Sequence, residues 1–249
     1  MKRKEPAGCA RCPFDAALRI CQKEDGKAPP FCPTENMAEV IEEAQKELDK
    51  PEILEFARQA SIQEGEGYTD RELGYDYARP VKPRIVEVIE FAEKMGYKTL
   101  GLAFCIGLRK EAKIVENLLT MNGFVVVSGV CKMGRVPKER IGVRNDQKIR
   151  IGGFKPMCNP IAQALLLNQS STEFNILMGL CVGHDSLFLK YAKAPCTVLA
   201  VKDRLLGNNP LAAIYTIDGY YRSLKTPILK DSSNRPPRRS GLFPRDRRF

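Results

Sequence analysis

The stretch FNILMGLCVGHDSLFLKYAKA, residues 174–194, predicts a buried strand, a tight turn and a helix in succession. Residues 175–180 form a short apolar run, which is typical of a strand that is covered on both faces. Cys181 follows this run directly, and Asp185 or Ser186 is expected to cap the helix. Because ligands of open α/β sheets gather just beyond the carboxyl ends of the strands, Cys181 stands where a site is expected.

Three other cysteines occupy comparable places in the pattern. Cys105 and Cys131 each follow an apolar run that predicts a strand. Cys158 directly precedes Asn159, which is a favourable cap for the helix that follows. If the strands are parallel, these cysteines and Cys181 meet at one edge of one sheet. The simpler alternative is that all four are buried free cysteines, which pack as small hydrophobic residues.

From residue 98 onward, strand and helix patterns alternate as in βαβ units, which predicts a mostly parallel, Rossmann-like α/β sheet flanked by helices. A cysteine-rich metal knuckle and a helical segment are expected to precede this sheet. Strands are expected over residues 98–104, 123–130, 175–180 and 197–201. The predicted domains are the knuckle at 1–33, the helical segment at 34–97, the α/β domain at 98–224 and a basic tail at 225–249.

Residues 34–97 carry apolar side chains at helical spacing and predict four helices. Thr34 is expected to cap the first of them, and prolines are expected to begin the second and the fourth. A short third helix is expected between Thr69 and Tyr77.

The N-terminal segment holds four cysteines in the spacing C-x2-C-x8-C-x10-C: Cys9, Cys12, Cys21 and Cys32. A segment this short has almost no apolar core, so it needs a covalent or metal cross-link to fold. Four cysteine ligands on one metal would provide that cross-link, with zinc as the simplest metal and an iron–sulfur cluster as the alternative. A redox-active CxxC motif without metal is the other interpretation.

Composition narrows the chemistry of the site. The chain has 249 residues, nine cysteines and a single histidine, His184. Its N-terminus lacks the apolar segment of a secretory signal, and its apolar runs are too short to cross a membrane, so we expect a cytoplasmic protein with no membrane partner. Cysteines in a reducing compartment are more often metal ligands or catalysts than disulfides. With one histidine, any metal is held mainly by sulfur, which favours zinc or iron–sulfur clusters.

The formal net charge of +10 is unevenly distributed. Residues 230–249 contain seven Lys and Arg against two Asp, so half of the excess lies in the tail. A basic tail is typical of a flexible electrostatic contact. Nucleic acid is a possible but unfavoured partner, because the tail lacks interleaved aromatic residues through most of its length and no recognition motif is present.

Several charged residues lie next to the cysteines in sequence. His184 and Asp185 follow Cys181 closely and are candidate catalytic acid–base groups, although His184 is equally compatible with a cap or core position. A long basic connection at 132–156 is typical of a lid or binding loop. The cations that we expect to bind an anionic cofactor or substrate are Arg109, Lys132, Lys202 and Arg204, with ordinary solvated charge as the alternative.

Five segments of the chain resemble an uncharacterised bacterial and archaeal family of cysteine-rich proteins that is described as metal-binding. They are LGLAFCIGLRKEA (100–112), CK (131–132), PMCNPIAQALLLN (156–168), GLCVGHDSLFLKYAKAP (179–195) and LAVKDRLLGNNPLAAIY (199–215). The resemblance runs from the cysteine-rich start to about residue 224 and implies metal binding by the cysteines in these segments. It implies no particular activity.

Two classes of function follow from these residues. In the first, Cys105, Cys131, Cys158 and Cys181 hold or flank a [4Fe–4S] cluster in an enzyme that acts on a small anionic substrate. Three ligands would leave one iron open, whereas four would suit electron transfer. In the second, the protein is a non-catalytic metal or electron carrier, or a subunit of a larger assembly, with a redox partner protein. We expect the sulfur atoms of at least three of these cysteines to lie within a span suited to one cluster, with His184 facing the same cavity.

Overall fold

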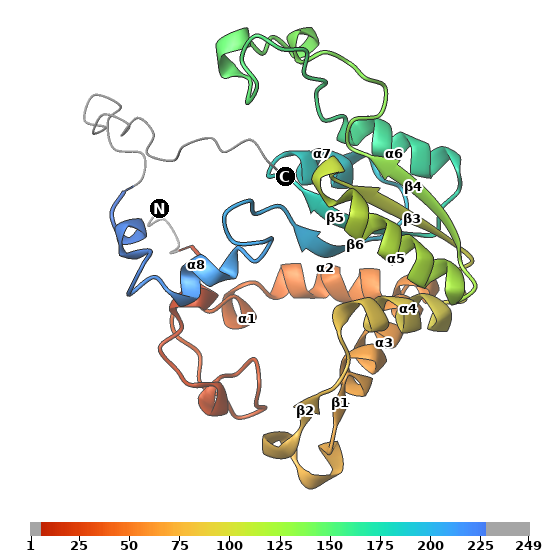
Figure 1. Ribbon diagram of the computed structural model, residues 1–249. Coiled ribbons are helices and arrows are strands. Elements are labelled where there is room, and N and C mark those ends of the chain that lie inside the picture. Colours follow the sequence, from red (N-terminus) through yellow and green to blue (C-terminus); the bar gives the residue numbers. More distant parts are fainter. Residues whose placement is uncertain (1–5, 228–249) are drawn as a thin grey trace. The chain divides into compact units, whose positions relative to one another are not determined.

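The computed structural model describes residues 6–227, so most of the basic tail predicted over 225–249 lies outside the described residues. The chain divides into two units between Tyr97 and Lys98 (Figure 1). Within residues 6–227, every helix is too short or too polar to cross a lipid bilayer.

A four-stranded parallel sheet forms the centre of the second unit, in the order β4-β3-β5-β6. Its strands are β3 (Thr99–Phe104), β4 (Val125–Val130), β5 (Phe174–Leu180) and β6 (Cys196–Val201). Every residue of β5 is buried, which explains why the sequence of this strand is continuously apolar rather than alternating. The predicted mostly parallel α/β sheet is confirmed.

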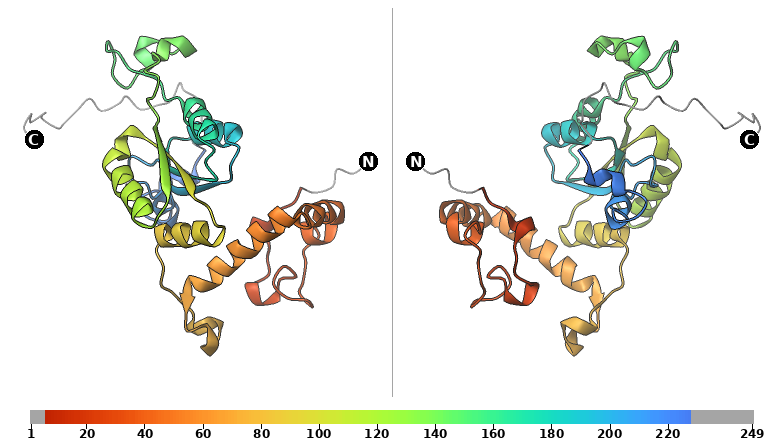
Figure 2. Two further views of the ribbon diagram at one scale, coloured as in Figure 1. Left: turned by 90° about the vertical axis from the view of Figure 1, so that its right-hand side faces the viewer. Right: turned by 90° about the vertical axis from the view of Figure 1, so that its left-hand side faces the viewer.

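Three helices connect the strands: α5 (Arg109–Met121), α6 (Pro160–Gln169) and α7 (His184–Tyr191). The chain passes from β3 outward to β4, then crosses back to β5 and continues to β6, so the direction of winding reverses between β3 and β5. Helix α5 covers one face of the sheet, and α6 and α7 cover the other (Figure 2). This reversal point is where open α/β sheets bind their ligands.

The core of the second unit lies between the sheet and these helices. Its fully buried large side chains include Leu100, Leu102, Leu119, Leu167 and Phe188. Burying one such side chain stabilises the fold by about 1.5–3 kcal/mol, so this layer holds the strand ends in place.

The two helices beside the site begin in different ways. Asn159 caps α6 as predicted, because its side chain accepts a hydrogen bond from the Ala162 N–H at 3.1 Å. Helix α7 has no side-chain cap, so the prediction of Asp185 or Ser186 as its cap is wrong. Gly183, at φ 82°, turns the chain so sharply that α7 begins at His184, before either of the predicted caps.

The first unit is mainly helical. Its helices are α1 (Pro33–Asn36), α2 (Ala38–Leu48), α3 (Pro51–Glu66) and α4 (Arg84–Lys94). Thr34 lies inside α1 rather than at its cap, which corrects the prediction for this residue. Where a short third helix was expected, two 3-10 turns, Arg71–Leu73 and Tyr75–Tyr77, connect the strands of a hairpin, β1 (Tyr68–Thr69) and β2 (Arg79–Pro80). The left-handed backbone at Asp70 prevents a continuous α-helix there.

Helices α3 and α4 pack through an aromatic contact and a polar network. The rings of Phe56 and Phe91 meet edge to face with centroids 5.0 Å apart. Glu90 of α4 accepts hydrogen bonds at 2.7 Å from both Lys82 and Gln63, and Gln63 is buried. The polar side chains therefore connect the two helices beyond their apolar contact.

The remaining regular structure is short. Helix α8 spans Leu211–Tyr215 in the second unit. The described residues also include 3-10 turns at Cys9–Arg11, Ala16–Leu18, Arg71–Leu73, Tyr75–Tyr77, Ile106–Leu108, Lys138–Ile141, Asn145–Gln147 and Arg222–Lys225.

Candidate functional site

A pocket of about 500 Å³ opens at the carboxyl edge of the parallel sheet, where the winding reverses. Cys105 directly follows β3, Cys131 directly follows β4, and Cys181 directly follows β5. Cys158 stands two residues before α6. All four cysteines line this one pocket, and His184 lines it with them. The sheet thus gathers residues that are far apart in the sequence.

A glycine bulge at the end of β5 sets the position of Cys181. Gly179 has φ 67°, and the pairing of β5 with β6 shifts register around it. A side chain here would meet Leu108, because a Cβ on Gly179 would lie 2.2 Å from Leu108 Cδ1. Bulges of this kind bend a strand and redirect the residues that follow it.

Three of the sulfur atoms form a hydrogen-bonded row with Cys131 in the middle. Interaction with the buried Cys131 thiol lowers the pKa of Cys105 and that of Cys158 to about 5, and the same interactions raise the pKa of Cys131. Desolvation opposes the lowering at both neighbours.

Each of the four sulfurs also receives a hydrogen bond from an N–H group. Backbone N–H groups of Gly107 and Ile106 donate to Cys105 and Cys131 respectively, the second at 3.4 Å. Among side chains, Lys132 Nζ donates to Cys158 Sγ at 3.2 Å. Arg204 donates to Cys181 Sγ at 3.0 Å, and this hydrogen bond raises the pKa of the guanidinium. Such donors stabilise sulfur in its anionic form.

Lys202 completes the positive surroundings of the sulfur row. It follows β6 directly, and its charge contributes to the lowered pKa of Cys105. Its Nζ lies 3.3 Å from the point that a Cβ on Gly179 would occupy, so the glycine leaves room for the ammonium group. Lys132, Lys202 and Arg204, three of the cations predicted from the sequence, therefore lie at the pocket.

Two predicted residues do not line the pocket. Arg109 is exposed at the start of α5. The Asp185 carboxylate accepts a hydrogen bond from the Ser186 N–H at 2.8 Å. His184 does line the pocket, and its Nδ1 is buried without a hydrogen-bond partner among the described residues. Of the two candidate acid–base groups, only His184 faces the cysteines.

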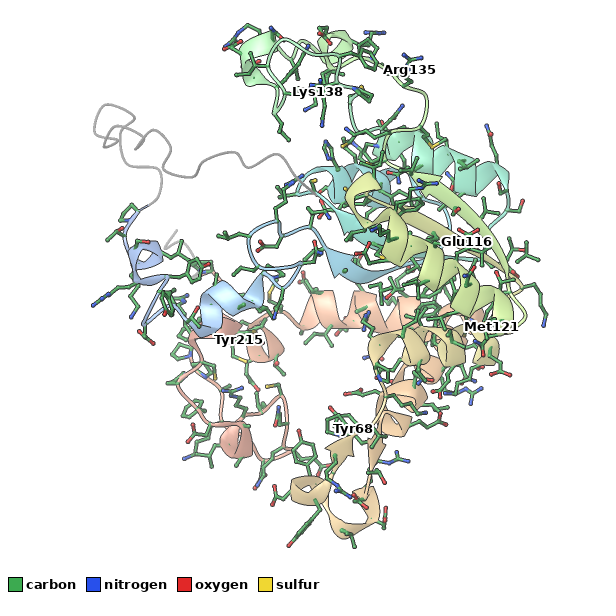
Figure 3. All side chains as sticks on the ribbon, viewed as in Figure 1. Tyr68, Glu116, Met121, Arg135, Lys138 and Tyr215 are labelled. Atoms are coloured by element: carbon green, nitrogen blue, oxygen red, sulfur yellow. The ribbon has the colours of Figure 1, made fainter. Side chains whose placement is uncertain are left out.

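The pocket also contains residues that were not singled out from the sequence. Lys138, Ile149 and Lys155 reach it from the long connection between β4 and α6, where a lid or binding loop was expected. We call residues 138–155 the basic loop; Figure 3 marks Lys138 on it. Asp203 and Asn208 line the pocket from the segment after β6. The basic composition of the loop was visible in the sequence, but which of its lysines face the pocket was not.

The base of the basic loop is closed by backbone pairing. Pro137 and Pro156 form an antiparallel bridge, and the Met157 N–H donates to the Val136 carbonyl at 2.8 Å. Further along, the buried Lys148 forms an ion pair with Glu139. These contacts return the chain to α6 next to the point where it left β4.

The four N-terminal cysteines also gather around one hollow. Cys9, Cys12, Cys21 and Cys32 line a space of about 110 Å³, which is much smaller than the pocket at the sheet edge. A backbone bridge between Arg19 and Lys27 brings Cys21 and the segment after it back toward the CxxC pair. The two sets of four cysteines lie in separate units.

The donor atoms at the two sets of cysteines decide whether a metal fits them. All nine cysteines are free, and within residues 6–227 no three His, Cys, Asp or Glu side chains stand in the arrangement that holds a metal ion. Their chemistry nevertheless fits, because four thiols around one space form a soft donor set that suits zinc or an iron–sulfur cluster. Metal binding at either set would require the cysteine side chains to rotate toward a common centre.

Comparison with known proteins locates the matched part of the chain. A family model described as "Protein of unknown function (DUF1847)" matches residues 32–199. The chain is 42% identical over 174 residues to "Uncharacterized protein MJ0455" of Methanocaldococcus jannaschii, and this alignment covers 70% of the chain and 86% of the relative. No solved structure matches the chain. The family match contains all four cysteines of the sheet-edge pocket and His184.

Proposed function

Because the chain belongs to the DUF1847 family of proteins of unknown function, we propose its function from the site itself. The protein binds an iron–sulfur cluster, of the [4Fe–4S] type, at Cys105, Cys131, Cys158 and Cys181, and acts as an enzyme on a small anionic molecule. The free state of all nine cysteines fits a reducing compartment such as the cytoplasm.

The observation that carries this proposal is the hydrogen bonding of the sulfurs. All four face one pocket, and each receives an N–H group from the backbone, a lysine or an arginine. A buried neutral thiol needs no such donors, because it packs as a small hydrophobic residue. Thiolates need them, and four neighbouring thiolates also repel one another unless a cation lies between them.

Pocket size favours a cluster over a single zinc ion at the sheet edge. The space there is about 500 Å³, whereas the hollow among the N-terminal cysteines is about 110 Å³. Four thiolates and a cluster carry a net negative charge, which the cations beside the sulfurs, Lys132, Lys202 and Arg204, would offset. The smaller N-terminal hollow suits one zinc ion with a structural role, with a second cluster as the alternative.

When bound, a cluster supplies electron transfer or, where one iron lacks a cysteine ligand, a Lewis acid. The chain itself contributes the remaining functions. Lys132 and Arg204 donate hydrogen bonds to Cys158 and Cys181 and so place positive charge beside these two sulfurs. His184, whose buried Nδ1 has no partner in the described chain, is the candidate to give or accept a proton at a bound substrate.

A non-catalytic electron carrier is the second candidate function, with a redox protein as its partner. The feature that favours an electron carrier is that each of the four sulfurs accepts a hydrogen bond from an N–H group. This is the arrangement expected when all four cysteines are ligands and no iron is open. The unpartnered His184 favours the enzyme instead, because a carrier has no use for an acid–base group beside its cluster.

Anaerobic purification of the full chain tests the metal. We expect a brown protein with iron and acid-labile sulfide, and we expect Cys131→Ser and Cys181→Ser to lose most of both. Cys196→Ser is the matched control, since burial raises the pKa of Cys196 and this residue does not line the pocket. A colourless wild-type protein that contains only zinc would contradict the proposal.

A further inference from the structure

We propose that Lys138 and Lys155, at the base of the basic loop, bind the anionic group of the ligand at the cysteine pocket. This inference deepens the proposed function and rests on it for the role of the pocket. The sequence predicts Lys132, Lys202 and Arg204 as the anion-binding cations beside the cysteines. In the structure those three cations interact with the cysteine sulfurs, so Lys138 and Lys155 are the cations of the pocket that remain to bind a ligand.

The two lysines face each other across the base of the loop. Pro137 pairs with Pro156 in an antiparallel bridge, and the Lys138 N–H donates to the Lys155 carbonyl at 3.2 Å. Lys138 and Lys155 are therefore cross-strand neighbours, and both line the pocket. Both are partly buried, so their ammonium groups are shielded from bulk water more than surface lysines are.

Like charges placed opposite one another on paired strands are destabilising. Within residues 6–227, neither Lys138 nor Lys155 has a hydrogen-bond or ion-pair partner on its side chain. Lys148 of the same loop shows the contrast, because it is buried and is paired with Glu139. An anion between Lys138 and Lys155 would relieve their repulsion, which is why a ligand fits this position.

The other charged residues of the pocket are already engaged. Lys132 and Arg204 donate to sulfur, and Lys202 acts on Cys105. Asp203 is the acidic residue of the pocket lining, and its carboxylate accepts hydrogen bonds from two backbone N–H groups, those of Leu205 and Leu206, at 2.9 Å each. The lining therefore offers no carboxylate that is free to neutralise Lys138 and Lys155.

The chemistry of the pair defines the class of ligand. Ammonium groups act as point charges with several donors, which suits a carboxylate or a phosphate. Ile149 lies in the same pocket wall and offers an apolar surface next to these charges. The ligand we infer is a small organic carboxylate or phosphate with a short apolar portion, held with its anionic end at the loop and its other end toward the sulfurs.

The test measures binding of inorganic phosphate and of malonate to the anaerobically purified full chain by calorimetry, with iron and sulfide content measured on each sample. For the double variant Lys138→Gln/Lys155→Gln, we expect affinity for at least one anion to fall at least tenfold while iron and sulfide stay unchanged. Lys138→Arg/Lys155→Arg keeps the charges and should retain affinity within about threefold.

The matched control removes two charges from the same loop at positions outside the pocket lining. Arg140→Gln/Arg150→Gln should leave affinity within twofold, which separates a specific site from the general positive field of the loop. If Lys138→Gln/Lys155→Gln and Arg140→Gln/Arg150→Gln bind the anion with equal affinity, the inference is overturned. It is also overturned if the wild type binds neither anion. If the wild type lacks iron but its anion affinity still depends on the lysine pair, the cluster proposal fails and the anion site stands.

Discussion

At the scale of single residues, Gly179 near the end of β5 sets the position of Cys181 in the pocket. Its backbone lies in the left-handed region at φ 67°, and the space that a side chain would need is filled by Leu108. Both constraints therefore require glycine, one through backbone strain and the other through packing.

Replacing Gly179 with alanine should destabilise the second unit by about 2–4 kcal/mol, because backbone strain and overpacking combine. Gly142→Ala is the matched control, since Gly142 has φ 75° but open space around it, and it should cost only about 1 kcal/mol. Urea unfolding of both variants measures the difference. Equal losses of unfolding free energy in the two variants would mean that Leu108 moves aside without loss of stability.

At the scale of elements, one side chain of α6 joins the ends of two strands. Gln163 is fully buried, and its Nε2 donates to the carbonyls of Phe104 in β3 and Gly129 in β4, the latter at 2.6 Å. These carbonyls lie just before Cys105 and Cys131. Helix α6 thus ties together the strand ends that carry two of the four sulfurs, and Cys158 lies two residues before the same helix.

In the first unit, the pairing of α3 with α4 should depend on pH. The hydrogen bonds from Lys82 and then Gln63 lower the pKa of Glu90. A carboxyl with a lowered pKa in the folded state adds stability above its unfolded pKa of about 4.3, and this stability is lost as the pH falls through the folded value.

We therefore expect Glu90→Gln to lower the free energy of unfolding at pH 7 by about 0.5 kcal/mol, a small value because solvent screens this partly exposed pair. The difference from wild type should disappear under acid conditions below the folded pKa. Thermal unfolding at a series of pH values measures it, with Glu64→Gln on the exposed side of α3 as the control. A difference that persists unchanged in acid would exclude the charge as its cause.

The strands were predictable because each is a continuous apolar run that ends at a turn signal. Residues 98–104 and 175–180 coincide closely with β3 and β5. The hairpin of β1 and β2 was missed because its strands have two residues each and carry no periodic pattern. The positions of Lys138 and Lys155 were missed for a related reason, since they depend on the pairing of Pro137 with Pro156, which is not encoded by any local pattern.

The four cysteines of the pocket were predictable as a set because parallel strands place their carboxyl ends at one edge. The interactions among their sulfur atoms were not predictable, because they depend on side-chain positions at the sheet edge that neither residue type nor order in the chain determines. Which cations contact the sulfurs and which are left to bind a ligand also depends on side-chain geometry, and residue type alone does not determine it.

At the scale of the whole molecule, the two sets of four cysteines belong to different units and should bind metal independently. We expect Cys12→Ser to lose one equivalent of metal, and protease digestion to cut within residues 6–33, because metal binding there supplies the folding energy of a segment with little core.

The iron and sulfide content assigned to the second unit should stay the same in Cys12→Ser. Cys181→Ser should show the reverse pattern, with loss at the sheet edge and an unchanged N-terminal digestion pattern. Metal analysis and peptide mapping of both variants check this independence. Loss of all metal in either variant would show that the two sets form one cooperative site.

The closed base of the basic loop has a consequence for protein engineering. Residues 138–155 leave and re-enter the domain at adjacent points, and doubling the length of such a loop costs only about 0.6 kcal/mol in closure entropy. The cysteines, by contrast, are fixed by the strands and cannot move without loss of the sheet. Protein engineering can therefore exchange the loop as a cassette, while the strands that carry Cys105, Cys131 and Cys181 at their ends stay unchanged.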